Sequence, residues 1–446
     1  MRINMKKRQI YTGVVERVDF PNKAVVKAQV PQPDESVATE YAVVKGALPG
    51  QTVEFSVKKA RKNKCEGRLR SVLKKGQLET REAKCPNFGT CGGCNYQEIP
   101  YEQQLALKKE QVLRLIDAVY EGDGYQYDGI LSVRKDGQYR EWGYRNKMEF
   151  SFGDAVKDGP LTLGLHKKGS FHDIVDAEGC QIVHPDYSAV LACVREYAKE
   201  NNIPYYHKRD HQGVLRHLLV RRAEVSGDML VALVTSTQQE IDYSELVSRL
   251  LALPLEGQIT GILQICNDSL GDVVQSDETK ILYGKDWFEE KVLGLTFKIS
   301  PFSFFQTNTL GAEVLYDQVR EYVGETKDKL VYDLYTGTGT IAQMLAPVAS
   351  KVVGVEIVEE AVEAAKKNAV DNHLDNCEFI AGDVLKVVDN LTQKPDILVL
   401  DPPRDGIHPK ALRKIINFNV DEMVYVSCKP TSLMRDLLVF REAGYE

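Results

Sequence analysis

The sequence predicts a multidomain α/β protein with three parts. An OB-like β-barrel is expected over residues 1–74, a mostly β central domain over 75–300, and a Rossmann-like parallel sheet over 301–446. Short alternating strands between residues 10 and 73, a largely β pattern from 128 to 300, and alternating strands and helices from 329 onward are the three observations behind this prediction.

The N-terminal part combines short strands with a strong positive charge. Turn signals such as FPNK, LPG and RKNK separate the runs YTGVVERV, AVVKAQV, EYAVVKGA and QTVEFSVKKA. Residues 1–75 carry a net charge of +10 in a chain whose total is −7. A basic module on an acidic body, with the basic loop KKARKNK at 58–64, suits RNA binding, although a purely structural barrel fits almost as well.

The bulk composition excludes several classes. The basic N-terminus is not followed by a long apolar stretch, so we expect no secretory signal. No uncharged apolar run approaches the ~20 residues that span a bilayer. Nine cysteines, unevenly spaced in 446 residues, fit a reduced cytoplasmic protein better than a disulfide scaffold.

The central part starts with a helix-periodic stretch at 101–120 and continues as mainly β structure. The segment VLRHLLVRRAEVSGDMLVALVTS predicts a hairpin that turns at Ser226-Gly227-Asp228. This part is also basic, which adds to the case for RNA as a partner. The residues concerned are Arg145, Lys147, Lys208, Arg209, Arg216, Arg221 and Arg222.

A nucleotide-type cofactor site is predicted at the first strand of the C-terminal sheet. DLYTGTGT, residues 333–340, joins that strand to a helix, and its glycines allow close approach of the backbone to a ligand. Glu356, at the end of the second strand, suits ribose hydroxyls, and Asp383 suits an adenine amino group. The third glycine of a dinucleotide pattern is absent, although the Ala at position 342 is sometimes allowed there. The leading Asp333 favours S-adenosylmethionine over a dinucleotide.

A nucleophile is predicted near the C-terminal end of the same sheet. Asp401-Pro-Pro-Arg404 follows the fourth strand and Ser427-Cys428-Lys429-Pro430 follows the fifth. Ligands bind at the carboxyl ends of parallel strands. A following helix and a neighbouring lysine both favour a thiolate at Cys428. Asp401 is a candidate for orienting the base or the cofactor, and Arg404 for anchoring the nucleotide.

Such a thiolate suits methylation of a pyrimidine. Carbon 5 of uracil is a poor nucleophile, and addition of a thiolate at carbon 6 makes an enolate that can attack a sulfonium methyl. A base then removes the proton on carbon 5, and the thiol is eliminated.

These residues resemble the TRAM-domain RNA (uracil-5-)-methyltransferases, and most closely their iron–sulfur-containing 23S ribosomal RNA branch. SPFSFFQTN, DLYTGTG, VVGVEIV, DPPR and SCKP occur in the family's order. The resemblance implies S-adenosyl-L-methionine as cofactor, Cys428 as nucleophile, and Gln306 and Asn308 as groups that reach cofactor and target base. The implied cofactor pocket also contains Tyr335, Gly337, Gly339, Thr340, Glu356, Asp383 and Asp401, and Arg404 is expected to contact RNA.

Two departures from the family pattern stand out. Lys429 replaces an asparagine found in many members after the nucleophile. The family's proposed general base is a glutamate in a final strand pair, which has no counterpart before Glu446. We expect the sheet to lack its last two strands here, and the natural protein to continue for a few tens of residues.

A metal site is predicted at CPNFGTCGGC. Cys85, Cys91 and Cys94 supply three soft ligands, and Cys180 in DAEGCQIVHP is the best fourth. Spacing alone leaves zinc and iron–sulfur open, and the resemblance implies a 4Fe–4S cluster. We expect it to fix the start of the central domain to the loop of Cys180 rather than to take part in catalysis.

Several alternatives stay open from the sequence. A transfer RNA uridine-5 methyltransferase is the main one, and cytosine-5 methylation uses similar thiolate chemistry. A non-catalytic iron–sulfur RNA-binding protein and a redox sensor are rivals of a different class. A monomer without a membrane partner is expected.

Overall fold

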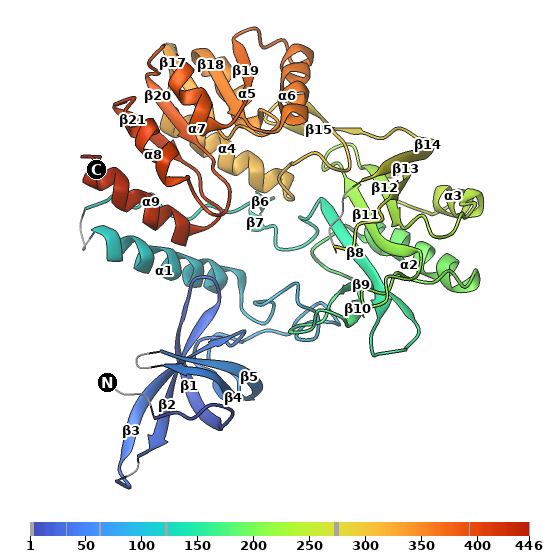
Figure 1. Ribbon diagram of the computed structural model, residues 1–446, viewed down its shortest axis with the longest axis vertical. Helices are drawn as coiled ribbons and strands as arrows, with labels where there is room; N and C mark the ends of the chain where they lie inside the picture. Colours follow the sequence, from blue (N-terminus) through green and yellow to red (C-terminus); the bar gives the residue numbers. More distant parts are fainter. Residues whose placement is uncertain are drawn as a thin grey trace. The chain divides into compact units, whose positions relative to one another are not determined.

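The computed structural model describes residues 4–32, 34–61, 64–120, 124–271, 276–391 and 393–445 (Figure 1). The chain forms two compact units. The first comprises residues 1–84, 94–130 and 429–446, and the second comprises residues 85–93 and 131–428. Glu446 and two residues of the 58–64 loop, Lys62 and Asn63, lie outside the described residues.

The first unit contains a closed five-stranded barrel in the order β1-β2-β3-β5-β4. Alternating apolar residues fill its interior, with Val26, Val44 and Phe55 fully buried. The barrel-like N-terminal sheet predicted from the sequence is therefore confirmed. Its strands are β1 (Ile10–Asp19), β2 (Lys23–Pro31), β3 (Val37–Lys45), β4 (Thr52–Arg61) and β5 (Lys64–Lys74).

Two helices complete this unit, α1 (Tyr101–Tyr120) and α9 (Pro430–Glu442), and they pack on each other. Arg441 of α9 donates to the carbonyl of Val119 and lies 4.6 Å from the ring centroid of Tyr120. α1 spans the range that its periodicity predicts.

The second unit contains a seven-stranded sheet in the order β10-β9-β8-β11-β12-β13-β14. All neighbours are antiparallel except β12 and β13. The predicted hairpin is β11–β12, and Gly227 in its turn has a φ of 74°. The strands are β8 (Lys147–Asp154), β9 (Leu161–His166), β10 (Ile174–Asp176), β11 (Leu215–Arg222), β12 (Asp228–Thr235), β13 (Gln258–Cys266) and β14 (Glu278–Gly284).

This sheet carries two helices that the sequence reading did not identify, α2 (Pro185–Glu200) and α3 (Ser244–Leu251). The α2 signal was present, because Pro185 is at the first helical position and the side chain of His184 caps the helix. Two small hairpins also belong to the unit: β6 (Arg134–Lys135) with β7 (Gln138–Tyr139), and β15 (Phe288–Val292) with β16 (Leu295–Ile299).

The same unit ends in a five-stranded, all-parallel sheet in the order β19-β18-β17-β20-β21. Its strands are β17 (Thr326–Leu334), β18 (Ala349–Glu356), β19 (Cys377–Ala381), β20 (Ile397–Leu400) and β21 (Glu422–Tyr425). Helices flank it (Figure 1): α4 (Thr309–Val323), α5 (Thr340–Leu345), α6 (Glu359–Asp371), α7 (Val384–Val387) and α8 (Pro409–Ile416). Short 3₁₀ turns follow α5 and α7, at Ala346–Val348 and Val388–Asn390.

The predicted Rossmann-like sheet is confirmed: its strands are parallel and alternate with helices along the chain. The expectation of two further strands beyond Glu446 stays a prediction. Among the described helices, none has both the length and the apolar content that crossing a bilayer requires.

Candidate active site at the carboxyl edge of the parallel sheet

The parallel register brings the predicted residues to one edge of the sheet. Leu334 at the end of β17 is paired with both Val355 and Leu400, and Leu400 is paired with Tyr425. Side chains at or just after the ends of these strands must therefore lie along one edge. They are Glu356, the last residue of β18, and Tyr335, Asp383, Asp401 and Cys428, which lie one to three residues after β17, β19, β20 and β21.

The loop after β17 depends on residues with positive φ. Tyr335, Gly337 and Gly339 have φ values of 70°, 57° and 74°. The amides of Tyr335 and Thr336 both donate to the carbonyl of Val355, at 2.9 and 3.0 Å. A Cβ on Gly339 would lie 2.6 Å from Cε1 of Phe379, so both the conformation and the space require glycine there.

Glu356 fixes this loop to the end of β18. Its carboxylate accepts from the amide of Gly337 at 3.0 Å, and from the amides of Ile357 and Val358 at 2.8 and 3.0 Å. Three backbone donors hold the carboxylate in one orientation. Oε1 accepts two of these amides and Oε2 accepts one, so Oε2 keeps a further acceptor position for a ligand hydroxyl.

A buried and a half-buried carboxyl, Asp333 and Asp401, follow at this edge of the sheet. Burial raises the pKa of Asp333 to about 7, with the charges of Asp401 and Glu356 acting in the same direction. Burial also raises the pKa of Asp401 to about 6. Oδ2 of Asp333 accepts from Thr336 Oγ1 at 2.5 Å. Within the described residues its buried Oδ1 meets no partner in hydrogen-bonding geometry, although the Ala342 amide lies close enough to lower the pKa.

These groups give the site a definite electrostatic character. A buried carboxyl with an unused acceptor favours a cationic ligand or an N–H donor, since either would stabilise its charged form. The site is therefore suited to a positively charged cofactor.

The segment with Gln306 and Asn308 is held by a residue that sequence reasoning did not single out. Nδ2 of Asn146 donates to the carbonyl of Gln306 at 3.0 Å and to Thr309 Oγ1 at 2.7 Å, and its amide donates to the carbonyl of Thr307 at 2.9 Å. Asn308 itself caps α4, accepting from the amide of Gly311 at 3.0 Å.

Behind Thr309 lies a second buried acid. The Thr309 hydroxyl donates to Glu290 Oε2 at 2.8 Å, and burial raises the pKa of Glu290 to about 7. Glu290 is the central residue of β15, FEEKV, and it points to the buried face of that strand. An acid at an inward position of a strand was the available signal for it.

Tyr316 was also missed. It projects from α4 and is 5% exposed, and its pKa is raised mainly by burial and by the charge of Asp401, while a hydrogen bond with the Gln306 side chain lowers it. Its hydroxyl thus lies between a predicted cofactor residue and the DPPR segment.

The remaining predicted residues differ in exposure. Asp383 caps α7 through the amide of Leu385, at 2.9 Å. Thr340 is buried at the start of α5, and its hydroxyl lies 3.4 Å from that of Thr338. Cys428 and Arg404 are exposed.

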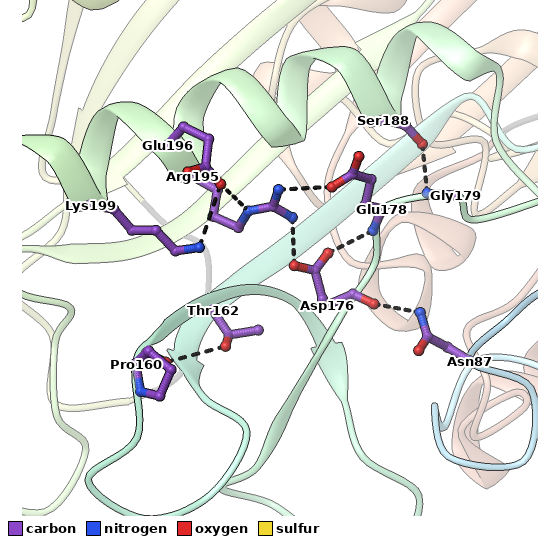
Figure 2. Close-up of polar contacts among 10 residues, drawn as sticks. All are labelled: Asn87, Pro160, Thr162, Asp176, Glu178, Gly179, Ser188, Arg195, Glu196 and Lys199. Atoms are coloured by element: carbon purple, nitrogen blue, oxygen red, sulfur yellow. Dashed lines mark hydrogen bonds and ion pairs between the residues drawn. The ribbon is translucent and has the colours of Figure 1, made fainter.

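The predicted metal ligands fall in both units, Cys85, Cys91 and Cys180 in the second and Cys94 in the first. In the second unit, Asn87 donates from Nδ2 to the carbonyl of Asp176 at 2.7 Å, which holds the 85–93 loop against the segment before Cys180 (Figure 2). Arg195 of α2 binds the carboxylates of Asp176 and Glu178 on that segment, at 2.5 and 2.8 Å (Figure 2).

No three Cys, His, Asp or Glu side chains within the described ranges are arranged to hold a metal ion. Four thiolates are a donor set whose chemistry suits an iron–sulfur cluster. The 4Fe–4S site therefore stays a prediction, and no catalytic step is derived from it.

A parallel sheet with a glycine loop after its first strand and acids at the ends of the next ones is typical of class I methyltransferases and of other proteins that bind nucleotide-type cofactors. A family model described as a methyltransferase domain matches residues 325–441. Uncharacterized RNA methyltransferases of Clostridium tetani and Clostridium acetobutylicum are 44% and 45% identical to the chain, each covering 99% of it and 93% of their own length. The chain belongs to this RNA methyltransferase family, and the prediction of an RNA methyltransferase is confirmed.

A solved structure shares the whole fold. The Pyrococcus abyssi tRNA (uracil-54, C5)-methyltransferase, in complex with S-adenosyl-L-homocysteine, has a TM-score of 0.71 with 23% identity. The match covers 96% of this chain and 92% of that one. At this identity the likeness demonstrates a common fold.

The glycine loop yields a prediction with an internal control. Gly339→Ala and Gly337→Ala both place a side chain at positive φ, which costs about 1–2 kcal/mol. Only Gly339→Ala adds the contact with Phe379, because a Cβ at Gly337 meets nothing within 4 Å. We expect Gly339→Ala to lower the free energy of unfolding clearly more than Gly337→Ala in urea titrations. Equal losses would contradict the proposed close packing.

The buried Asp333 predicts a pH effect on stability. Its pKa of about 7 when folded exceeds the value of about 3.9 in an unfolded chain, so the folded state binds the extra proton and loses stability as the pH rises between these values. Asp333→Asn removes this loss. The free energy of unfolding of the wild type, relative to that of Asp333→Asn, should therefore fall between pH 4.5 and pH 8 in thermal or urea unfolding. Asp375→Asn, at an exposed position, is the control and should follow the wild type at every pH. A pH-independent difference for Asp333→Asn would refute the raised pKa.

Proposed function

We propose that the protein methylates carbon 5 of a specific uridine in 23S ribosomal RNA, with S-adenosyl-L-methionine as donor and through a covalent Cys428–uracil adduct. The observation that carries the proposal is the placement of an exposed cysteine after β21, on the edge where the glycine loop and the acids also end. Thiolate attack and methyl transfer need the nucleophile and the cofactor side by side, and this edge supplies both positions.

The cofactor residues follow from the same edge. S-adenosyl-L-methionine supplies a methyl group on a positively charged sulfur and also carries an ammonium group. The carboxyls of Asp333 and Asp401 support a cation there, because a cation would stabilise their charged forms. The residues proposed to hold it are Gln306, Tyr335, Gly337, Gly339, Thr340, Glu356, Asp383 and Asp401.

The chemistry assigns a task to each remaining group. The Cys428 sulfur adds to carbon 6 of uracil, and the electron pair of the 5,6 double bond moves toward carbon 5 and oxygen 4. Carbon 5 takes the methyl group, a base removes the proton from carbon 5, and the carbon–sulfur bond breaks to restore the double bond. We assign Asn308 and Arg404 to holding the RNA.

The N-terminal barrel is proposed to be a TRAM domain that binds RNA, as its net charge suggests. We propose a cytoplasmic monomer. Transfer RNA is the alternative substrate, favoured by the fold shared with the Pyrococcus abyssi enzyme named above. Methylation assays with each RNA distinguish between the two substrates.

The central test combines Cys428→Ala with RNA mass spectrometry. Purified protein, S-adenosyl-L-methionine and ribosomal or transfer RNA from cells that lack the gene should yield 5-methyluridine in 23S RNA only. Cys428→Ala should lose at least about three orders of magnitude in rate, because the nucleophile is gone. Cys193→Ala is the matched control and should keep its activity.

RNA containing 5-fluorouridine sharpens this test, since fluorine on carbon 5 cannot leave as a proton does. A denaturation-stable adduct should form with the wild type and not with Cys428→Ala. Methylation of transfer RNA alone would contradict the ribosomal assignment. No methyl transfer to either RNA would favour a non-catalytic RNA-binding protein.

We further propose that Cys85, Cys91, Cys94 and Cys180 bind a 4Fe–4S cluster with a structural role. Support comes from the contacts that join the 85–93 loop to the segment before Cys180. Four thiolates are the usual ligand set of such a cluster.

Metal analysis tests this assignment. Protein purified without oxygen should contain about four iron and four sulfide per chain and should be brown. Cys180→Ser should lose the iron and lower the melting temperature, whereas Cys193→Ser should keep the iron. A colourless, zinc-containing protein would overturn the assignment.

A further inference from the structure

The turn between β9 and β10, residues 167–173, presents an unusual surface. Phe171 in this turn is 86% exposed, the largest exposed fraction of any large apolar side chain that the structure describes. Lys167, Lys168 and His172 surround it in sequence. An exposed phenyl ring beside lysine side chains is the combination that binds single-stranded nucleic acid, by stacking on a base and attracting the phosphates.

The turn is held in one conformation by its own hydrogen bonds. The Lys167 amide donates to the carbonyl of Asp173 at 2.9 Å, and the Ser170 amide donates to the carbonyl of Lys167 at 3.0 Å. The Ser170 hydroxyl accepts from the amides of His172 and Asp173, both at 3.2 Å. Gly169 supplies the positive φ of 78° that the turn needs.

The 85–93 loop braces the turn from outside. Cys91 forms an antiparallel bridge with Lys167. The Gly92 amide donates to the carbonyl of His166 at 3.0 Å, and the Lys168 amide donates to the carbonyl of Thr90 at 2.8 Å. Phe171 therefore stands on a backbone that is ordered before any ligand arrives, which lowers the entropy cost of binding.

The topology places this turn at the end of the sheet nearest the candidate active site. β8 and β9 are antiparallel, so the end of β9 at His166 lies at the same end of the sheet as the start of β8 at Lys147. Asn146, directly before β8, binds the carbonyls of Gln306 and Thr307. An RNA strand that delivers a base to that site has this end of the sheet within its path.

The local charges are mixed but favour an anion. Lys167 Nζ lies 4.0 Å from Asp173 Oδ2, which is a weak and partly exposed pair. Lys147 is paired with Glu149 at 2.8 Å. Arg145 adds a further cation at this end of the sheet, donating from Nε to the carbonyl of Lys147 at 2.9 Å.

We infer that the 167–173 turn is a binding surface for single-stranded RNA, in which Phe171 stacks on an unpaired base next to the target nucleotide and Lys167 contacts the backbone. This inference rests on the proposed function, because it takes the methylated uridine to lie in a single-stranded segment. It assigns to the 85–93 loop the task of holding the turn in place.

The experiment measures RNA affinity with the full chain. The probe is a fluorescein-labelled single-stranded RNA, followed by anisotropy over a range of salt concentrations, with the same sequence as a duplex for comparison. Phe171→Ala should weaken binding of the single strand by about 5- to 150-fold, the range expected for loss of one base–aromatic stack. Phe171→Tyr should restore it, and binding of the duplex should not change.

The salt dependence separates the two kinds of contact. Phe171→Ala removes no charge, so the slope of log affinity against log salt should stay as in the wild type. Lys167→Ala should reduce that slope by about 0.7, the value for one phosphate contact on a single strand. Val156→Ala, an exposed apolar residue in the turn at the other end of β9, is the matched control and should bind like the wild type.

The inference is overturned if Phe171→Ala binds the single strand as the wild type does. It is likewise overturned if Phe171→Ala changes only the oligomeric state in size-exclusion chromatography. A wild type that forms 5-methyluridine while Phe171→Ala leaves both the KM for RNA and the affinity unchanged would reject this surface and leave the proposed function intact. If Phe171→Ala weakens RNA binding while the wild type transfers no methyl group, the RNA-binding surface is supported and the proposed function is rejected.

Discussion

The hydrogen bonds of Asn146 are the constraint on which the arrangement of the second unit depends. This one residue, directly before β8, binds the carbonyls of Gln306 and Thr307 and the hydroxyl of Thr309, and its own carbonyl accepts from the amide of Arg222. It therefore joins the antiparallel sheet to the segment that leads into α4. Each of these backbone groups would otherwise need another partner, because buried polar groups without one are costly. The candidate active site is built on both sheets for this reason.

Much of this architecture could be read from the sequence, since it follows from local patterns. The βα alternation after residue 329 fixes a parallel sheet, and parallel strands bring Asp401 and Cys428 to the edge that holds the glycine loop. The barrel strands alternate with period two, and α1 begins and ends where its periodicity does. These features need only neighbouring residues in the chain.

What could not be predicted depends on partners distant in sequence. Asn146 lies 160 positions from Gln306, and nothing in YRNKMEF specifies that contact. Glu290 and Tyr316 have ordinary local contexts, and their pKa values are raised by burial against other elements and by acids distant in sequence, Glu224 and Asp401. The helix α2 was missed for a different reason, because the β-rich region around it hid a capped helix of normal length.

Tyr335 shows what the glycine loop requires of the chain. Its φ of 70° lies in the left-handed region, where a residue with a Cβ costs about 1–2 kcal/mol more than glycine. The chain uses glycine at positions 337 and 339 of the same loop, so the conformation itself does not demand a side chain at 335. A tyrosine at position 335 therefore introduces backbone strain into the site, and this strain lowers the stability of the fold. The same residue provides an aromatic ring at the carboxyl edge of the sheet. At position 335 glycine would therefore avoid the strain, but the loop would lose its aromatic ring.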